Sequence, residues 1–299
     1  IRTRSVANVV AEIEENYEVL TPLFISMCDS DFMPGTAKRR EWIYSLLEEL
    51  EARDIRVSIR VNTRANDIIY YKDDIALFKS KGLDSYFLGI ESFNKRQLDL
   101  YDKKTTVEQN IEAIKILQFQ NVNFEMGFII IEPYVSIEEI IENLEILKGL
   151  NVYSCLDYNQ SFFTCGSTLF SIFGTKIFSR ILEDGIQSSN DLGYEFINPD
   201  IHLFYEDLKI WMNIISNYDY LRFLIDKAIY YSEQTTKQNL LDCLNKLREI
   251  DVDFMLDLAY IYQNGRNKVE VSQLLKKSNT LIERAFMKYS KDIDYIMQR

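Results

Sequence analysis

The sequence predicts an α/β fold in which a partial parallel (β/α) barrel, residues 1–185, precedes an all-helical region, residues 186–299. Two observations support this prediction. Over the first 160 residues, apolar segments alternate with amphipathic segments, and the strands recur at intervals of roughly thirty to forty residues, as in β/α units. Beyond Asp200, apolar residues recur with the period of an α-helix.

The expected strands are near-continuous apolar runs, which is typical of parallel strands that are covered on both faces. They are Leu23–Cys28, Ile55–Asn62, Tyr86–Ile90, Phe124–Ile131 and Val152–Tyr158. We expect the fourth of them to be buried on both faces. A helix precedes the first of these strands, so the sequence also predicts that the first strand of the barrel is missing.

The helices of the barrel region are predicted from apolar residues that recur on one face. They are Ser5–Tyr17, Lys38–Ala52, Asp67–Lys81, Val107–Gln118 and Ser136–Lys148. Ser5 and Ser136 are the expected N-caps of the first and last of these helices, because a serine hydroxyl can accept a hydrogen bond from the first turn.

The C-terminal region is predicted to contain only helices after a loop at residues 185–193. The expected helices are Leu203–Ser216, Tyr220–Tyr231, Thr236–Ile250, Met255–Tyr262 and Val269–Tyr289. Aromatic residues at helical spacing, among them Trp211 and Phe223, are interpreted as core packing rather than as a base-stacking surface.

Charge and composition exclude several classes of function. A net charge of −12, from 34 basic and 46 acidic residues, disfavours nucleic acid and anionic membranes as partners. His202 is the only histidine, which argues against zinc chemistry and against Ser-His or Cys-His catalysis. No apolar run approaches the roughly eighteen residues of a membrane span.

The four cysteines are widely separated and fit no metal-ligand spacing. They are Cys28, Cys155, Cys165 and Cys243. We therefore predict reduced thiols, a cytoplasmic location and no metal ligand in this chain. The oligomeric state is not indicated by the sequence.

Polar residues lie at or just after the end of every predicted strand. In chain order they are Asp29, Ser30 and Asp31; Asn62 and Arg64, with Arg60 just inside the strand; Glu91 and Ser92; Glu132; and Asn159 and Gln160. Side chains at the carboxyl ends of parallel strands point into the mouth of a barrel, so we predict a polar ligand pocket there. Carboxylates, amides and guanidinium groups suit a zwitterion with ribose hydroxyls. No individual catalytic residue is predicted.

Several blocks of sequence in this order resemble a known enzyme family. The blocks are RTRSVANVVAEIE, LFISMCDSDFM, FLGIESFNKRQLDLYDKKTTVEQNIEAIKIL, GFIIIEPYVSIEEIIENLEIL and, at Gly166–Phe170, GSTLF. From about Arg2 to Gly185 they resemble radical S-adenosylmethionine (SAM) enzymes, and are most similar to the branch that often carries an N-terminal cobalamin-binding domain.

The resemblance implies an activity and its cofactors. It implies that a [4Fe-4S] cluster cleaves SAM reductively, and that the resulting 5′-deoxyadenosyl radical abstracts hydrogen from a peptide or small metabolite, or supports methyl transfer to it. Cobalamin is a further cofactor that the branch implies. The resemblance places Asp29 and Asp31 at the methionine amino end, Arg60, Asn62, Glu91 and Ser92 toward the ribose, methionine or substrate, and Ile130 and Ile131 near the adenine.

The chain departs from the family in one large respect. The CxxxCxxC loop, which holds the cluster in this family, does not occur, and the scattered cysteines cannot replace its thiolates. We expect that this loop and the missing first strand belong to a segment that has been cut off before Ile1, so that this chain alone is inactive.

Two alternatives remain open at the level of sequence. The chain is a cluster-free relative that acts as a binding or interaction module, or it is an unrelated barrel enzyme. In the second alternative, Glu91 and Glu132 are an acid–base pair, which requires that their pKa values are driven apart.

Overall fold

The structure is a computed structural model that describes residues 3–20, 23–122, 124–154, 168–231 and 234–290. The described chain forms two compact units. The first contains residues 3–91 and 105–127, and the second contains residues 92–104, 128–154 and 168–290. The predicted domain boundary after residue 185 stays a prediction, because compactness does not show which part folds alone.

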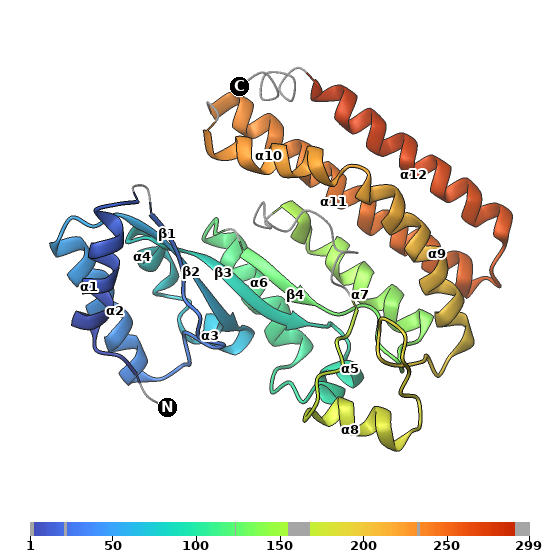
Figure 1. The fold of residues 1–299 in the computed structure, drawn as a ribbon, viewed down its shortest axis with the longest axis horizontal. Helices are drawn as coiled ribbons and strands as arrows, with labels where there is room; N and C mark the ends of the chain where they lie inside the picture. The colour runs from blue at the N-terminus through green and yellow to red at the C-terminus, as the bar shows by residue number, and fades with distance from the viewer. Residues whose placement is uncertain (1–2, 21–22, 123, 155–167, 232–233, 291–299) are drawn as a thin grey trace. The chain divides into compact units, whose positions relative to one another are not determined.

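The first unit is built on a parallel sheet with the strand order β1-β2-β3-β4. The strands are β1 (Leu23–Ser26), β2 (Val57–Arg64), β3 (Leu83–Glu91) and β4 (Phe124–Phe128). Consecutive strands are neighbours and helices lie between them in the sequence, so the predicted partial parallel (β/α) barrel is confirmed (Figure 1).

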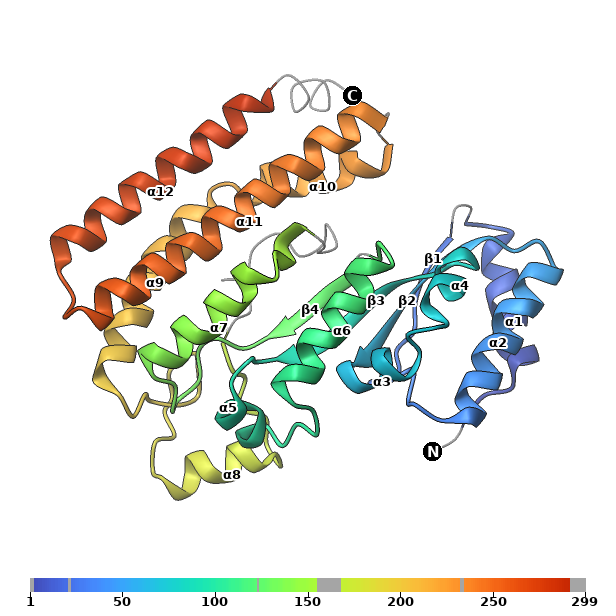
Figure 2. The same cartoon turned by 180° about the vertical axis from the view of Figure 1, so that it is seen from behind.

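Helices cover one face of this sheet. The helices of the first unit are α1 (Val6–Tyr17), α2 (Ala37–Ala52), α3 (Ala65–Tyr70), α4 (Ile75–Ser80) and α6 (Val107–Phe119). Figure 2 shows α3, α4 and α6 in front of the strands. Val57, Ile59 and Val61 of β2 are buried on the covered face, whereas Ser58 and Arg60 between them are only partly buried.

The second unit is almost entirely helical. Its helices are α5 (Lys95–Leu100), α7 (Ile137–Gly149), η1 (Val152–Ser154), α8 (Lys176–Glu183), α9 (Pro199–Ser216), α10 (Asp219–Tyr231), α11 (Gln234–Gln263) and α12 (Lys268–Lys288). The α11 helix packs against α7, α9, α10 and α12. Trp211 stacks on Phe254 with 4.3 Å between ring centroids and donates to Asp251 Oδ1 at 2.7 Å, so it is core, as predicted. The same prediction is wrong for Phe223 of α10, whose side chain is exposed.

Three predicted elements differ from the structure. The single helix expected over Asp67–Lys81 is two short helices joined by a turn at residues 71–74, and the Asp74 side chain in this turn accepts hydrogen bonds from Arg40 and Tyr44 of α2. The two helices expected over 236–262 are one, α11, since neither glycine nor proline interrupts them. The start of the expected strand Val152–Tyr158 is the 3₁₀-helix η1, and its remainder lies outside the described residues.

Among the residues that the structure describes, no helix combines the length and the low charge needed to cross a bilayer.

Candidate functional site

The first unit's sheet has a second face, opposite the one that α3, α4 and α6 cover, which we call the open face. Its described residues are largely polar. Asn62 follows Arg60 on this face of β2, Phe87 and Glu91 lie on β3, and Glu125 lies on β4; all are partly buried and alternate with buried apolar residues. The expectation that the fourth strand is buried on both faces is therefore wrong. The alternation in Phe-Glu-Met-Gly-Phe was the signal that the sequence offered.

An ion pair joins β2 to β4 on this open face. Arg60 Nε and Nη2 donate to the two carboxylate oxygens of Glu125 at 2.8 and 2.7 Å, and Nη1 donates to Ser26 Oγ at 3.3 Å. The guanidinium carbon lies 5.4 Å from the centre of the Phe87 ring, which belongs to the strand between them. This two-point geometry fixes the orientation of the Arg60 side chain.

Hydrogen bonds connect the loop after β1 to β2. Asn62 Nδ2 donates to the carbonyl oxygen of Asp29 at 2.8 Å, and the Phe32 amide donates to the Asn62 carbonyl at 2.9 Å. The Asp29 carboxylate lies 3.5 Å from Arg39 Nη2, and the Arg39 guanidinium lies over the rings of Phe32 and Trp42. Asp29, Asn62 and Arg60 therefore lie in one connected part of the sheet, as the sequence predicted for the strand ends.

Two carboxylates with raised pKa values, Asp31 and Asp67, lie at the same end of β2. Burial raises the pKa of Asp31, and Arg64, whose Nε lies 3.5 Å from Asp31 Oδ2, only partly opposes this. Burial and the nearby charge of Asp31 raise the pKa of Asp67 to about 6. Asp67 Oδ1 accepts from the Gly35 amide at 2.8 Å, whereas Asp67 Oδ2 and Asp31 Oδ1 are buried without a hydrogen-bond partner.

We expect Asp67→Asn to stabilise the protein at pH 7. Since the folded-state pKa of about 6 exceeds the usual 3.8, ionisation of Asp67 costs stability as pH rises between these values. The amide removes this cost, so the free energy of unfolding should rise by about 1 to 2 kcal/mol at pH 7 and lose part of its slope between pH 4 and 6. Urea unfolding across this pH range, with exposed Asp73→Asn as the matched control, measures it. An unchanged slope would contradict the assignment.

Glu91 lies at the end of β3 in a left-handed backbone conformation, with φ of 64°. A side chain at Gly127 of β4 would come within 3.2 Å of the Phe87 ring and 3.5 Å of Glu91 Oε2. Gly127 therefore provides the space in which the Glu91 carboxylate and the Phe87 ring lie. A left-handed non-glycine residue is strained, and such strain is common at binding sites.

Ser92, which follows Glu91, belongs to the second unit and is fully buried. Its hydroxyl donates to Gln97 Oε1 at 2.6 Å and accepts from the Asn94 amide at 2.9 Å. Asn143 of α7 completes this network, because its Oδ1 accepts from the Phe93 amide at 2.6 Å and its Nδ2 donates to Gln97 Oε1 at 2.8 Å. Ser92 thus holds the start of α5 in this structure.

Ile130 and Ile131 also belong to the second unit, where their exposed fractions are 1% and 0%. The Leu169 amide donates to the carbonyl of Ile131 at 2.8 Å, and Thr168 forms a parallel bridge with Ile131. Contacts of these two residues with an adenine stay a prediction. Asn159 and Gln160, the polar residues after the fifth expected strand, lie outside the described residues.

Glu132 is fully buried in the second unit and is committed to two partners. Its Oε1 accepts from Arg96 Nη2 at 2.6 Å and its Oε2 accepts from the Tyr134 amide at 2.7 Å, while Arg96 also pairs with Glu139. Burial raises the pKa of Glu132 although Arg96 opposes this. Glu132 is therefore part of a buried structural ion pair, and its carboxylate is not exposed as the proposed acid–base role would require.

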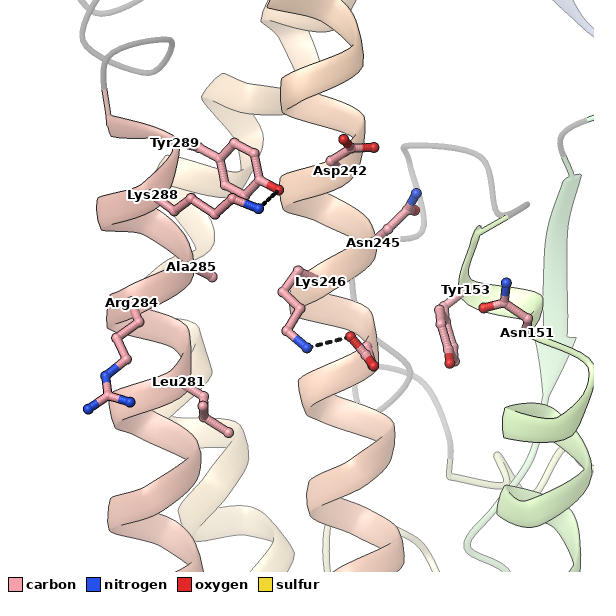
Figure 3. Close-up of a pocket in the computed structure, with 11 residues that line it drawn as sticks. Asn151, Tyr153, Asp242, Asn245, Lys246, Leu281, Arg284, Ala285, Lys288 and Tyr289 are labelled. Carbon is pink, nitrogen blue, oxygen red and sulfur yellow. Dashed lines mark hydrogen bonds and ion pairs between the residues drawn. The ribbon is translucent and has the colours of Figure 1, made fainter.

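Two hollows were not anticipated from the sequence. A cavity of about 600 Å³ lies beside β1 and is lined by residues that include Cys28, Asp29 and Arg39. A groove of about 540 Å³ lies in the helical unit between α11, α12 and Tyr153 (Figure 3). In this groove Lys246 pairs with Glu249, and Lys288 donates to the Tyr289 hydroxyl, so both lysines already have partners.

The described residues do not fit an iron–sulfur cluster. Within residues 3–290, apart from the undescribed gaps, no group of three or more His, Cys, Asp or Glu side chains is placed to hold a metal. Cys28 and Cys243, the described cysteines, are both free thiols, one exposed and one buried. No step through a cluster can be derived from these residues.

The comparisons with known proteins decide the family. The model of the Radical SAM superfamily matches residues 1–153, half of the chain. The chain belongs to the radical SAM superfamily. This confirms the resemblance seen in the sequence, and it excludes the alternative of an unrelated barrel enzyme.

Individual relatives in this superfamily are similar to the chain over part of their length. The anaerobic magnesium-protoporphyrin IX monomethyl ester cyclase of Rubrivivax gelatinosus is 28% identical over 250 residues, which are 81% of this chain and 42% of the relative. The 4′-phospho-dehydrooxetanocin synthase of Priestia megaterium is 37% identical over 139 residues, 42% of this chain and 18% of the synthase.

Solved structures share the fold of the chain. The apo form of the cobalamin-dependent S-adenosylmethionine radical enzyme OxsB matches with a TM-score of 0.75 and 16% identity, over 98% of this chain and 51% of OxsB. OxsB with aqua-cobalamin and S-adenosylmethionine bound matches with a TM-score of 0.75, 17% identity and coverages of 98% and 52%. The chain spans about half the length of these proteins.

Proposed function

We propose that this chain is the SAM-binding and C-terminal part of a radical SAM enzyme that acts on a small metabolite or a peptide in the cytoplasm. The observation that carries the proposal is the polar, partly buried open face of the sheet in a chain of this superfamily. Arg60, Asn62 and Glu91 supply a guanidinium, an amide and a carboxylate there. These groups complement the ammonium, carboxylate and ribose hydroxyls of SAM.

The residues of the first unit would bind and orient SAM. Asp29 and Asp31 would face its methionine end, Arg60 and Asn62 would contact its carboxylate or ribose, and Glu91 would accept hydrogen bonds from ribose hydroxyls. Bound SAM is the source of a 5′-deoxyadenosyl radical in this superfamily. Asp31 Oδ1, which is buried without a hydrogen-bond partner, supports the fit because a donor from the ligand would satisfy it.

The proposal assigns the [4Fe-4S] cluster to residues outside this chain. The CxxxCxxC motif is absent from the 299 residues, and the chain spans about half of its solved structural neighbours. Cobalamin is proposed as a second cofactor of the whole protein, and this is supported by the cobalamin-dependent neighbour OxsB. The chain alone is then expected to bind SAM without cleaving it.

Reconstitution of the longest natural polypeptide that contains this chain tests the function. After incubation with iron and sulfide and addition of a reductant, the protein should convert SAM to 5′-deoxyadenosine. The second candidate, a cluster-free binding module, is favoured by the lack of a CxxxCxxC motif in this chain. A natural polypeptide that incorporates no cluster and forms no 5′-deoxyadenosine would support that module and overturn the proposal.

A further inference from the structure

Glu125 is a charged residue of the open face that neither the sequence pattern of strand ends nor the proposed function uses. It lies near the start of β4, and its carboxylate accepts hydrogen bonds from two nitrogens of Arg60 at 2.8 and 2.7 Å, beside the Phe87 ring. The two side chains keep 19% and 17% of their surface exposed, so a ligand on this face would meet both of them.

Fold stability alone gives little reason for this pair. A partly exposed ion pair contributes little net free energy, because ordering and desolvation oppose the attraction. The neighbouring residues of β4 on the covered face, Phe124 and Met126, are buried and hold the strand in the sheet. We therefore attribute the Arg60–Glu125 pair to ligand recognition on the open face rather than to stability.

Carboxylates outnumber guanidinium groups on the open face and in the loop after β1. The carboxylates are Asp29, Asp31, Asp84, Glu91 and Glu125, and the guanidinium groups are Arg39, Arg60 and Arg64. Asp29 lies beside Arg39 and Asp31 beside Arg64, so each of these carboxylates already has a basic neighbour. Glu125 is the carboxylate that pairs with Arg60 through two hydrogen bonds, and it offsets part of the charge of this guanidinium group.

We propose that Glu125 is a specificity-determining residue, which makes the open face prefer a cationic sulfonium ligand over its neutral thioether analogue by offsetting the charge of Arg60. This inference rests on the proposed function, since it assumes that SAM binds on this face. Arg60 would repel the sulfonium without Glu125. With Glu125 in place, Arg60 keeps its hydrogen-bonding and ring-stacking surface while the local charge stays slightly negative.

The ratio of the dissociation constants for S-adenosylhomocysteine and SAM tests this inference, because the two ligands differ by one methyl group and one positive charge. Calorimetry on the chain should show that Glu125→Gln lowers the preference for SAM roughly fivefold. Glu112→Gln, an exposed position on α6, removes the same charge elsewhere and should leave the ratio unchanged.

A double variant keeps the test decisive if the single substitution perturbs folding. Arg60→Gln with Glu125→Gln replaces the ion pair by two amides of similar shape and restores the net charge of the face. The preference for SAM should return in this variant, although both ligands bind more weakly. Equal ratios for the wild type, Glu125→Gln and the double variant would overturn the inference and leave the proposed function intact. If the wild type bound neither ligand, the proposed function itself would fail.

Discussion

Asn143→Ala is expected to lower the free energy of unfolding by about 3 kcal/mol. Asn143 is fully buried on α7, and its side chain joins the Phe93 amide to Gln97 Oε1. Alanine leaves the Phe93 N–H without its partner in a place that water does not reach, and it adds a small cavity. Each unsatisfied buried group costs about 1 to 3 kcal/mol, which makes this one of the larger effects available in the molecule.

Urea unfolding of the chain measures this effect, and Asn94→Ala is its matched control. Asn94 caps α5 through its contact with the Gln97 amide at 3.2 Å, but it is only partly buried. Because water can replace the cap, we expect a loss of about 1 kcal/mol for Asn94→Ala. Equal losses of unfolding free energy for the two variants would show that the buried hydrogen bonds of Asn143 contribute no more than the exposed cap of Asn94.

The second large effect is expected at Glu91, where two substitutions should weaken SAM binding equally but differ in stability. Glu91→Ala and Glu91→Gly both remove the carboxylate, so both should weaken SAM binding by roughly ten- to a hundredfold, the value of hydrogen bonds to a charged group. Glycine has no penalty at a φ of 64°, so Glu91→Gly should be more stable than Glu91→Ala by about 1 kcal/mol.

Calorimetric titration with SAM tests the effect on binding, and thermal unfolding tests the effect on stability. Both are measured on the wild type, Glu91→Ala and Glu91→Gly. A variant that kept the affinity of the wild type would remove Glu91 from the site. If alanine and glycine gave the same stability, the backbone strain would have no energetic weight.

Local signals in the sequence were sufficient for much of the fold. The predicted cap Ser5 accepts from the Asn8 amide, and Ser136 forms a complete capping box with Glu139. Four of the five expected strands lie where apolar runs predicted them, because alternate residues of β2, β3 and β4 are buried on the face that the helices cover. The turn that ends at Asp74 was missed, since the local pattern is helical on both sides of it and the Asp74 side chain contacts Arg40, 34 residues away.

The site was only partly accessible from sequence for the same reason. The strand ends identified Asp29, Arg60, Asn62 and Glu91, which the structure describes in the first unit. Glu125 was missed because it lies near the start of its strand rather than near the end, and its partner Arg60 is 65 residues away. Hydrogen-bond networks between residues that are distant in the chain cannot be predicted from local sequence. Ser92 was therefore expected to face a ligand, whereas its hydroxyl donates to Gln97 in the structure.

Amide hydrogen exchange of the chain with and without SAM is the most direct test of where the ligand binds. The account predicts slower exchange after β1 at residues 27–33, at the end of β2 at residues 60–64, and around Glu91, with no change along α11 and α12. Protection confined to the groove that includes Lys246 and Tyr289, or no protection at saturating SAM, would contradict the claim that the open face of the sheet is the binding site.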